Sequence, residues 1–128
     1  MPGARLALGS LGGTITMTTA RGGSGVAPTM SADDLLAGMP DAAGVADVDT
    51  ATLATVPGAS LGFADVLGAL EWAERKVADG CAGVVLVQGT DTLEETSYLL
   101  DLHWDRPEPL VVTGAMRPPS SPGADGPA

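Results

Sequence analysis

The chain has 128 residues, 45% of them hydrophobic, and a formal net charge of −10. This size suits one domain or part of one, and the hydrophobic content argues against a disordered chain. Only six lysines and arginines are present, which argues against nucleic acid or an anionic membrane as a partner. Cys81 and His103 each stand alone, so we expect no disulfide and no metal site. No apolar run reaches the length of a membrane helix, and we therefore expect a cytoplasmic protein.

The N-terminal residues predict a strand, a loop and a flap. Residues 4–9 have the pattern of a strand, and residues 10–14 that of a tight glycine loop. Residues 15–30 are rich in Thr and Gly and have weak periodicity, so we expect them to form a mobile hairpin or flap.

A short helix and a second strand are expected next. Ser31 precedes two aspartates and two leucines, which makes it the expected N-cap of a helix that ends by Pro40. Residues 45–55 alternate partly between apolar and polar side chains, which predicts a strand. Residues 57–60 then form a turn.

The clearest helix is predicted at residues 63–77. Apolar residues recur there at helical spacing and should form one buried face. These residues are Phe63, Val66, Leu67, Leu70, Ala73 and Val77. We expect Lys76, the only lysine, to lie on the solvated side of this helix.

The remaining elements complete an α/β pattern. A strand is predicted at 84–87, a helix at 93–102 and a strand at 110–113. Alternation of continuous apolar strands with helices predicts a mostly parallel sheet flanked by helices. Residues 1–117 would form this domain, and residues 118–128 a Pro- and Gly-rich tail.

Polar and glycine residues follow two of the predicted strands. Residues 88–92, Gln-Gly-Thr-Asp-Thr, come directly after the strand at 84–87. In open α/β sheets, ligands bind beyond the carboxyl ends of the strands. Taken alone, this loop is equally typical of a strand-to-helix turn with Asp91 or Thr92 as N-cap. The glycine loop at 9–14 does not fit the dinucleotide-binding pattern. Because both loops should emerge at one sheet edge, Thr14 and Thr90 could face one pocket.

A third loop, Gly114-Ala115-Met116-Arg117-Pro118, follows the last predicted strand. Arg117 could pair with a substrate carboxylate or, as we rather expect, with a surface acid.

Together these motifs resemble those of the bacterial-type L-asparaginases and related glutaminase-asparaginases. The Gly-Gly-Thr-Ile signature occurs at residues 12–15, and Gln-Gly-Thr-Asp-Thr followed by Glu-Glu-Thr occupies residues 88–96, apart from Leu93. Gly-Ala-Met-Arg-Pro with a later Asp-Gly-Pro occurs at 114–118 and 125–127. The resemblance implies the N-terminal part of that family's α/β fold.

The resemblance also implies roles for individual residues. Thr14 would attack the side-chain amide of L-asparagine, giving an acyl-enzyme that water converts to L-aspartate. Thr90 would act through a lysine, and Asp91 would bind the substrate's α-amino group. Ser60 would bind the α-carboxylate. Backbone groups near Gly13 and Gly89 would also contact the substrate. The resemblance implies no cofactor and no metal, and a homo-oligomer.

Two departures from the family pattern bear on activity. Leu61 follows Ser60, where family members have Gln, and the flap at 16–29 lacks the family's Tyr. The family's lysine would lie beyond Pro127. We therefore expect these 128 residues to be inactive by themselves. The alternatives are a non-catalytic remnant and a module that binds an amino acid without turnover.

Overall fold

The computed structural model describes residues 3–19 and 25–126. Within them, four parallel strands form one sheet in the order β4 (Ala46–Val56), β1 (Ala4–Gly12), β5 (Gly83–Val87) and β6 (Leu110–Thr113). The predicted α/β fold with a mostly parallel sheet is confirmed.

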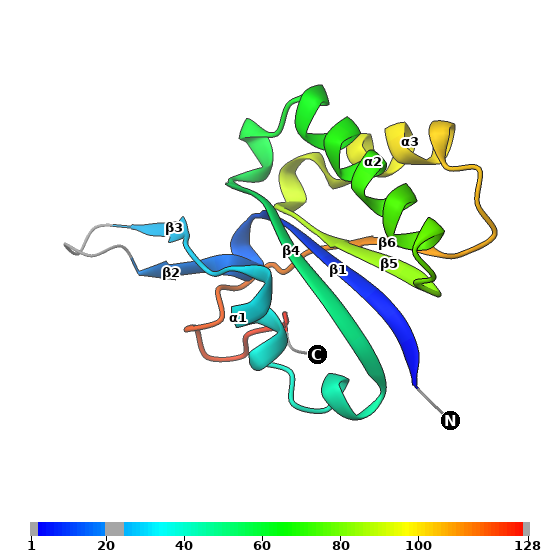
Figure 1. Ribbon diagram of the computed structural model, residues 1–128. Coiled ribbons are helices and arrows are strands. Elements are labelled where there is room, and N and C mark those ends of the chain that lie inside the picture. The colour runs from blue at the N-terminus through cyan, green and yellow to red at the C-terminus, as the bar shows by residue number, and fades with distance from the viewer. Residues whose placement is uncertain (1–2, 20–24, 127–128) are drawn as a thin grey trace.

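Helices cover this sheet on two sides (Figure 1). Helices α2 (Phe63–Ala78) and α3 (Leu93–His103) lie on one face, and the short helix α1 (Ala32–Ala37) lies on the other. Successive strand residues point to opposite faces. Ala7 accordingly packs in the cluster beneath α2 and α3, whereas the next residue, Leu8, packs in the cluster beneath α1.

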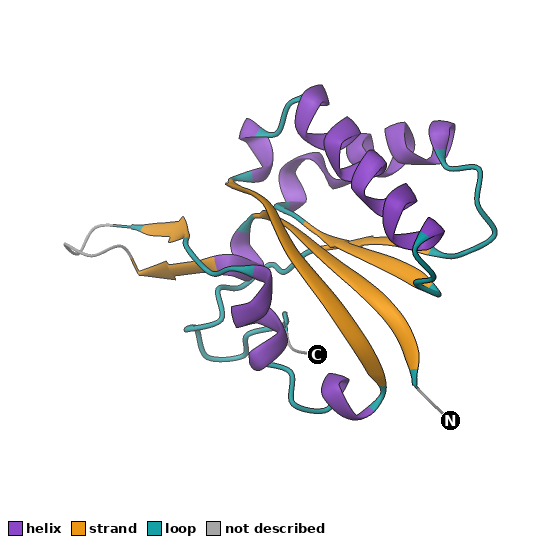
Figure 2. Ribbon diagram, viewed as in Figure 1, coloured by secondary structure: helices purple, strands orange, loops and turns teal. Residues whose placement is uncertain are grey.

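A small hairpin stands apart from the main sheet (Figure 2). Strands β2 (Met17–Thr19) and β3 (Val26–Pro28) pair antiparallel, so the expected hairpin after the glycine loop is present. The rest of the predicted flap, residues 20–24, lies outside the described residues.

Strand β1 is longer than predicted. It continues through Ser10 and Gly12, and its pairing with β4 shifts in register between these two residues. The predicted tight loop at 10–14 therefore begins only after Gly12. Gly12 can end the strand at this irregular position because, without a Cβ, its backbone approaches that of Val56 closely.

The buried face of α2 differs in part from the prediction. Val66, Leu70, Ala73 and Val77 are buried, but Phe63 is 79% exposed and Leu67 is 40% exposed. Leu67 lies about 100° around the helix from Val66, and thus off the stripe that faces the sheet. Phe63 is the first residue of the helix and lies at its margin.

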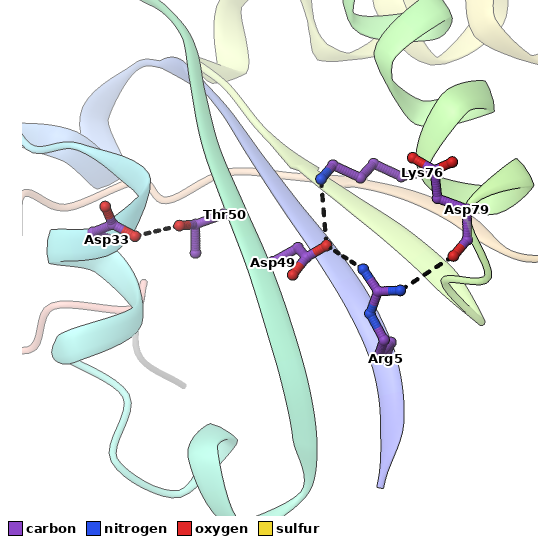
Figure 3. Close-up of polar contacts among 6 residues, drawn as sticks. All are labelled: Arg5, Asp33, Asp49, Thr50, Lys76 and Asp79. Carbon is purple, nitrogen blue, oxygen red and sulfur yellow. Dashed lines mark hydrogen bonds and ion pairs between the residues drawn. The ribbon is translucent and has the colours of Figure 1, made fainter. Parts of the chain in front are cut away.

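Lys76 is not a freely solvated side chain, contrary to expectation. Its Nζ lies 3.3 Å from Asp49 Oδ2 and 5.9 Å from the centre of the Trp72 ring. Its long methylene stem lets the ammonium group reach from α2 across to β4. Arg5 donates to the same Asp49 oxygen at 2.6 Å (Figure 3). This Arg5 contact is the main reason why the pKa of Asp49 lies below its ordinary value of 3.8.

The neighbouring residue ties β4 to the other helical side. Thr50 donates to the carboxylate of Asp33 on α1 (Figure 3). Asp49 and Thr50 thus connect one strand to helices on opposite faces of the sheet. The predicted N-cap of α1 is also confirmed, because the Asp34 amide donates to the Ser31 hydroxyl in a capping box.

Candidate active site

The loops that follow the four parallel strands touch one another through glycines. Gly13 follows β1, Gly58 follows β4, Gly89 follows β5 and Gly114 follows β6. A Cβ on Gly13 would overlap the backbone nitrogen of Gly89, and one on Gly58 would lie 2.8 Å from the Gly89 oxygen. A Cβ on Gly114 would lie 2.5 Å from the backbone oxygen of Gln88. The carboxyl ends of all four strands are therefore packed backbone against backbone.

Thr14 sits immediately after one of these contacts. Gly13 has φ 86° and ψ −175°, a conformation restricted to glycine. The Gly13 amide donates to Val56 O at 3.1 Å, and its carbonyl accepts from the Thr16 amide and hydroxyl at 3.0 and 2.8 Å. These bonds fix the single 3₁₀ turn Thr14–Thr16, in which Thr14 is half-buried.

The turn that ends at Ser60 and the loop after β5 are joined by a side-chain hydrogen bond. Ser60 ends the 3₁₀ turn Gly58–Ser60 and is exposed. Thr92 donates from its hydroxyl to Gly58 O at 2.9 Å. Thr92 does occupy the N-cap position of α3, as one prediction had it, but its side chain makes no capping bond. The hydroxyl bridges two loops instead.

Gln88 is a residue of this loop to which the sequence interpretation gave no role. Its side chain is completely buried, and its Nε2 donates to Gly89 O at 3.0 Å and to Thr92 Oγ1 at 3.4 Å. A glutamine directly after four apolar strand residues was the available signal, because a buried amide needs hydrogen-bond partners.

Thr90 and Asp91 follow Gly89 in the 3₁₀ turn Thr90–Thr92. Thr90 is half-buried, and its methyl group would lie 3.2 Å from a Cβ on Gly114. Asp91 is exposed. The structure thus brings the loops of Gly13, Thr14, Ser60, Gly89, Thr90 and Asp91 to one edge of the sheet.

The third loop folds back beside the nucleophile candidate. The Asp125 carboxylate accepts from the amides of Met116 and Arg117 at 3.0 and 2.9 Å, which holds the pKa of Asp125 below its ordinary value. The Arg117 guanidinium donates to Gly123 O at 3.3 Å, so its partner is a carbonyl and not the expected carboxylate.

The end of this loop lies close to Thr14. Gly126 lies against Ile15, the residue after Thr14. Pro127 lies outside the described residues.

This edge carries hydroxyls, backbone amides and carboxylates, among them those of Asp91 and Asp125. Lys76 belongs elsewhere, because its partner Asp49 is in register with Ala7, well before the end of β1. Residues 3–19 and 25–126 hold no cluster of His, Cys, Asp or Glu suited to a metal ion. A hydroxyl near backbone donors is suited to attack on a carbonyl carbon, provided that a base accepts its proton.

The family described as "Asparaginase, N-terminal" matches residues 5–128. The chain belongs to the asparaginase family. It is 35% identical to an L-asparaginase of Bacillus licheniformis over 124 residues, which are 94% of this chain and 38% of the relative. It is 34% identical to L-asparaginase 2-3 of Saccharomyces cerevisiae over 119 residues, 91% of this chain and 33% of the relative.

A solved asparaginase has the same fold. The crystal structure of a probable cytoplasmic L-asparaginase from Campylobacter jejuni superposes with a TM-score of 0.84 at 31% identity. The match covers 97% of this chain and 36% of that one. The chain therefore spans about a third of the length of these asparaginase relatives.

Proposed function

We propose that this chain supplies the nucleophile and the substrate-contacting loops of an enzyme that hydrolyses L-asparagine to L-aspartate and ammonia. The observation that carries the proposal is the glycine-to-glycine packing at the carboxyl edge. It holds Thr14 next to the loop of Thr90 and Asp91, as expected for a nucleophile and the groups that bind its substrate. The names of the asparaginase relatives supply the substrate.

Each residue then has a chemical task. The Thr14 hydroxyl attacks the amide carbon, ammonia leaves, and water hydrolyses the resulting ester. The Asp91 carboxylate binds the substrate's α-ammonium group, and the Ser60 hydroxyl donates to its α-carboxylate. Backbone amides in the Gly13 and Gly89 loops stabilise the negative charge that develops on the carbonyl oxygen.

The base that accepts the Thr14 proton is not Lys76. The Lys76 ammonium is bound to Asp49 and packed near Trp72, away from the carboxyl edge. We therefore propose that a lysine outside these 128 residues acts with Thr90, and that the 128 residues alone do not turn over asparagine.

We also propose that the enzyme is cytoplasmic and forms a homo-oligomer. The described part of the chain contains no helix long and apolar enough to span a membrane.

Leu61 favours one alternative. It follows Ser60 and, with Phe63 and Thr92, lines a cavity of about 170 Å³ beside the candidate site. An apolar side chain here cannot donate to a charged ligand. Leu61 thereby weakens the hold on a charged substrate, and a non-catalytic remnant is the second candidate function.

Ligand titration of the 128-residue chain tests the proposal. L-aspartate, the product, should shift the backbone amide signals of Ser60, Thr90 and Asp91. Asp91→Asn should weaken binding, whereas Asp101→Asn, at an exposed position on α3, should not. No saturable ammonia release from L-asparagine is expected. Absence of L-aspartate binding by the folded chain would contradict the proposed substrate site. Saturable ammonia release would refute the requirement for an outside lysine.

A further inference from the structure

A chain of three groups connects the two loops at the ends of the candidate substrate site. Gln88 Nε2 donates to Thr92 Oγ1 at 3.4 Å, and Thr92 Oγ1 donates to Gly58 O at 2.9 Å. Gly58 opens the turn that carries Ser60, while Gln88 and Thr92 flank Thr90 and Asp91. We call Gln88, Thr92 and the Gly58 carbonyl the loop bridge.

The chemistry of the acceptors fixes the direction of every bond in the loop bridge. Gly89 O can only accept, so the amide nitrogen of Gln88 must face it, at 3.0 Å. Gly58 O can also only accept, so the Thr92 hydroxyl must donate its single proton there. That hydroxyl is then left to accept from Gln88. Reversing the Gln88 amide would place its oxygen against Gly89 O and break both bonds.

Gln88 is not explained by stability alone. Among the described residues, its Oε1 has no hydrogen-bond partner although the side chain is completely buried. Burying a polar atom without a partner disfavours the folded state. An apolar side chain of similar size would fill the same space without that cost. The two donated bonds, both of which act on the loop of Thr90 and Asp91, are the interactions that glutamine supplies here and an apolar side chain would not.

We infer that Gln88 and Thr92 are positioning residues, which set the separation between the Ser60 turn and the Thr90–Asp91 turn. The inference rests on the proposed function in so far as these two turns bind opposite ends of one amino acid. Neither residue contacts the reacting atoms in this assignment. Their effect on the substrate site passes through Gly58 and Gly89.

Two substitutions of Thr92 separate the hydroxyl from the shape of the side chain. Thr92→Val keeps the branched shape but removes both bonds, whereas Thr92→Ser keeps the hydroxyl. Thr96→Val is the matched control, because Thr96 is a buried threonine one turn further along α3, at 4% exposure. The readout is the backbone amide spectrum of the 128-residue chain. The Gly58 carbonyl also accepts from the Leu61 amide at 3.1 Å, a bond that these substitutions leave in place. The Ala59 amide, which belongs to the same peptide unit as that carbonyl, is the reporter for the bond from Thr92.

We expect Thr92→Val to shift the Ala59 signal and to speed hydrogen exchange in the turns of Ser60 and Thr90. Thr92→Ser should leave both close to the wild-type values, and so should Thr96→Val. Unchanged signals in a folded Thr92→Val chain would overturn the inference. An equal disturbance in Thr92→Ser and Thr92→Val would overturn it as well, because the hydroxyl would then be irrelevant.

L-aspartate titration connects the loop bridge to the site. Loss of the two neutral hydrogen bonds of the Thr92 hydroxyl should weaken L-aspartate binding by about tenfold in Thr92→Val, with recovery in Thr92→Ser. Wild-type affinity in Thr92→Val would overturn the inference. If the wild-type chain bound no L-aspartate, the proposed function would fail, and the amide signals alone would decide whether the loop bridge exists.

Discussion

The backbone of Gly13 lies directly against the backbone of Gly89, with no space between them for a Cβ. These glycines lie at the start of the loops after β1 and β5, which are neighbours in the sheet. The contact therefore sets how near Thr14 comes to Thr90 and Asp91. A side chain at position 13 must separate the two turns, whereas one at position 89 would collide with Gly58 in the turn after β4.

Gly13→Ala tests this contact. The new methyl group would collide with Gly89, and the backbone at φ 86° would be strained as well. We expect the free energy of unfolding to fall by about 1–3 kcal/mol or more, measured by denaturant unfolding.

Gly68→Ala is the matched control for that measurement. Gly68 lies inside α2, and a Cβ there would meet nothing within 4 Å. Because glycine disfavours a helix interior, this change should raise the free energy of unfolding by about 0.5–1 kcal/mol. Equal effects of the two substitutions would show that Gly13 has no special contact.

Gln88→Met tests whether Gln88 contributes to the free energy of unfolding or to the local order of the Thr90–Asp91 loop. Methionine fills a similar volume and removes the unpartnered Oε1, so the free energy of unfolding should change by less than about 1.5 kcal/mol. The loop of Thr90 and Asp91 should nevertheless exchange its amides faster, because Gly89 O and Thr92 lose their donor. A large loss of stability with unchanged exchange in the loop would argue that Gln88 is purely structural.

Asp49→Asn should lower the melting temperature, because the carboxylate accepts from Arg5 on β1 and from Lys76 on α2. Added salt should reduce the difference from wild type, since both partners are partly exposed and their attraction is screened. Asp101→Asn on the exposed face of α3 is the control. A salt-independent difference would mean that packing is the cause.

Stability should fall at acidic pH through three carboxyl groups. The pKa values of Asp34, Asp49 and Asp125 lie below the ordinary value of 3.8, because Ser31, Arg5 and Met116 respectively donate to them. A lowered folded-state pKa contributes stability above 3.8 that is lost as the pH falls through the folded value. The melting temperature should therefore decrease as the pH falls below 3.8, and it should be nearly constant above about pH 5.

Asp125→Asn isolates one of these groups. It should reduce the decrease of the melting temperature at acidic pH. It should also release the loop of Met116 and Arg117 from their carboxylate acceptor. An unchanged pH profile in this variant would show that the Asp125 contacts contribute nothing to stability.

Local sequence patterns were enough to predict the elements and the fold class. The cap at Ser31, the apolar stripe of α2 and the apolar run of β5 each depend on neighbouring residues. The structure contains all three, although Phe63 and Leu67 lie outside the buried stripe. Alternation of strands and helices then predicted the parallel sheet. The order of motifs also indicated the family, which the comparison with known asparaginases confirmed.

Contacts between distant residues were not predictable in the same way. Lys76 looks solvated on a helical projection, and only the folded chain shows Asp49 within its reach. The sequence predicts Thr92 as an ordinary N-cap, and only the folded chain shows that its hydroxyl donates to Gly58 O. The glycines that touch one another recur at no regular spacing in the sequence. Their contacts depend on which strands are neighbours, which no local pattern specifies.

The central claim, that Thr14 is the nucleophile of an asparaginase site, is tested most directly in a chimera. Residues 5–126 of this chain would replace the matching segment of the L-asparaginase of Bacillus licheniformis, and ammonia release from L-asparagine would be measured. Thr55→Ala, at an exposed position on β4, is the control substitution. We expect an active chimera that keeps its activity with Thr55→Ala and loses at least about a thousandfold with Thr14→Ala. A folded but inactive chimera, or an active one that tolerates Thr14→Ala, would contradict the claim.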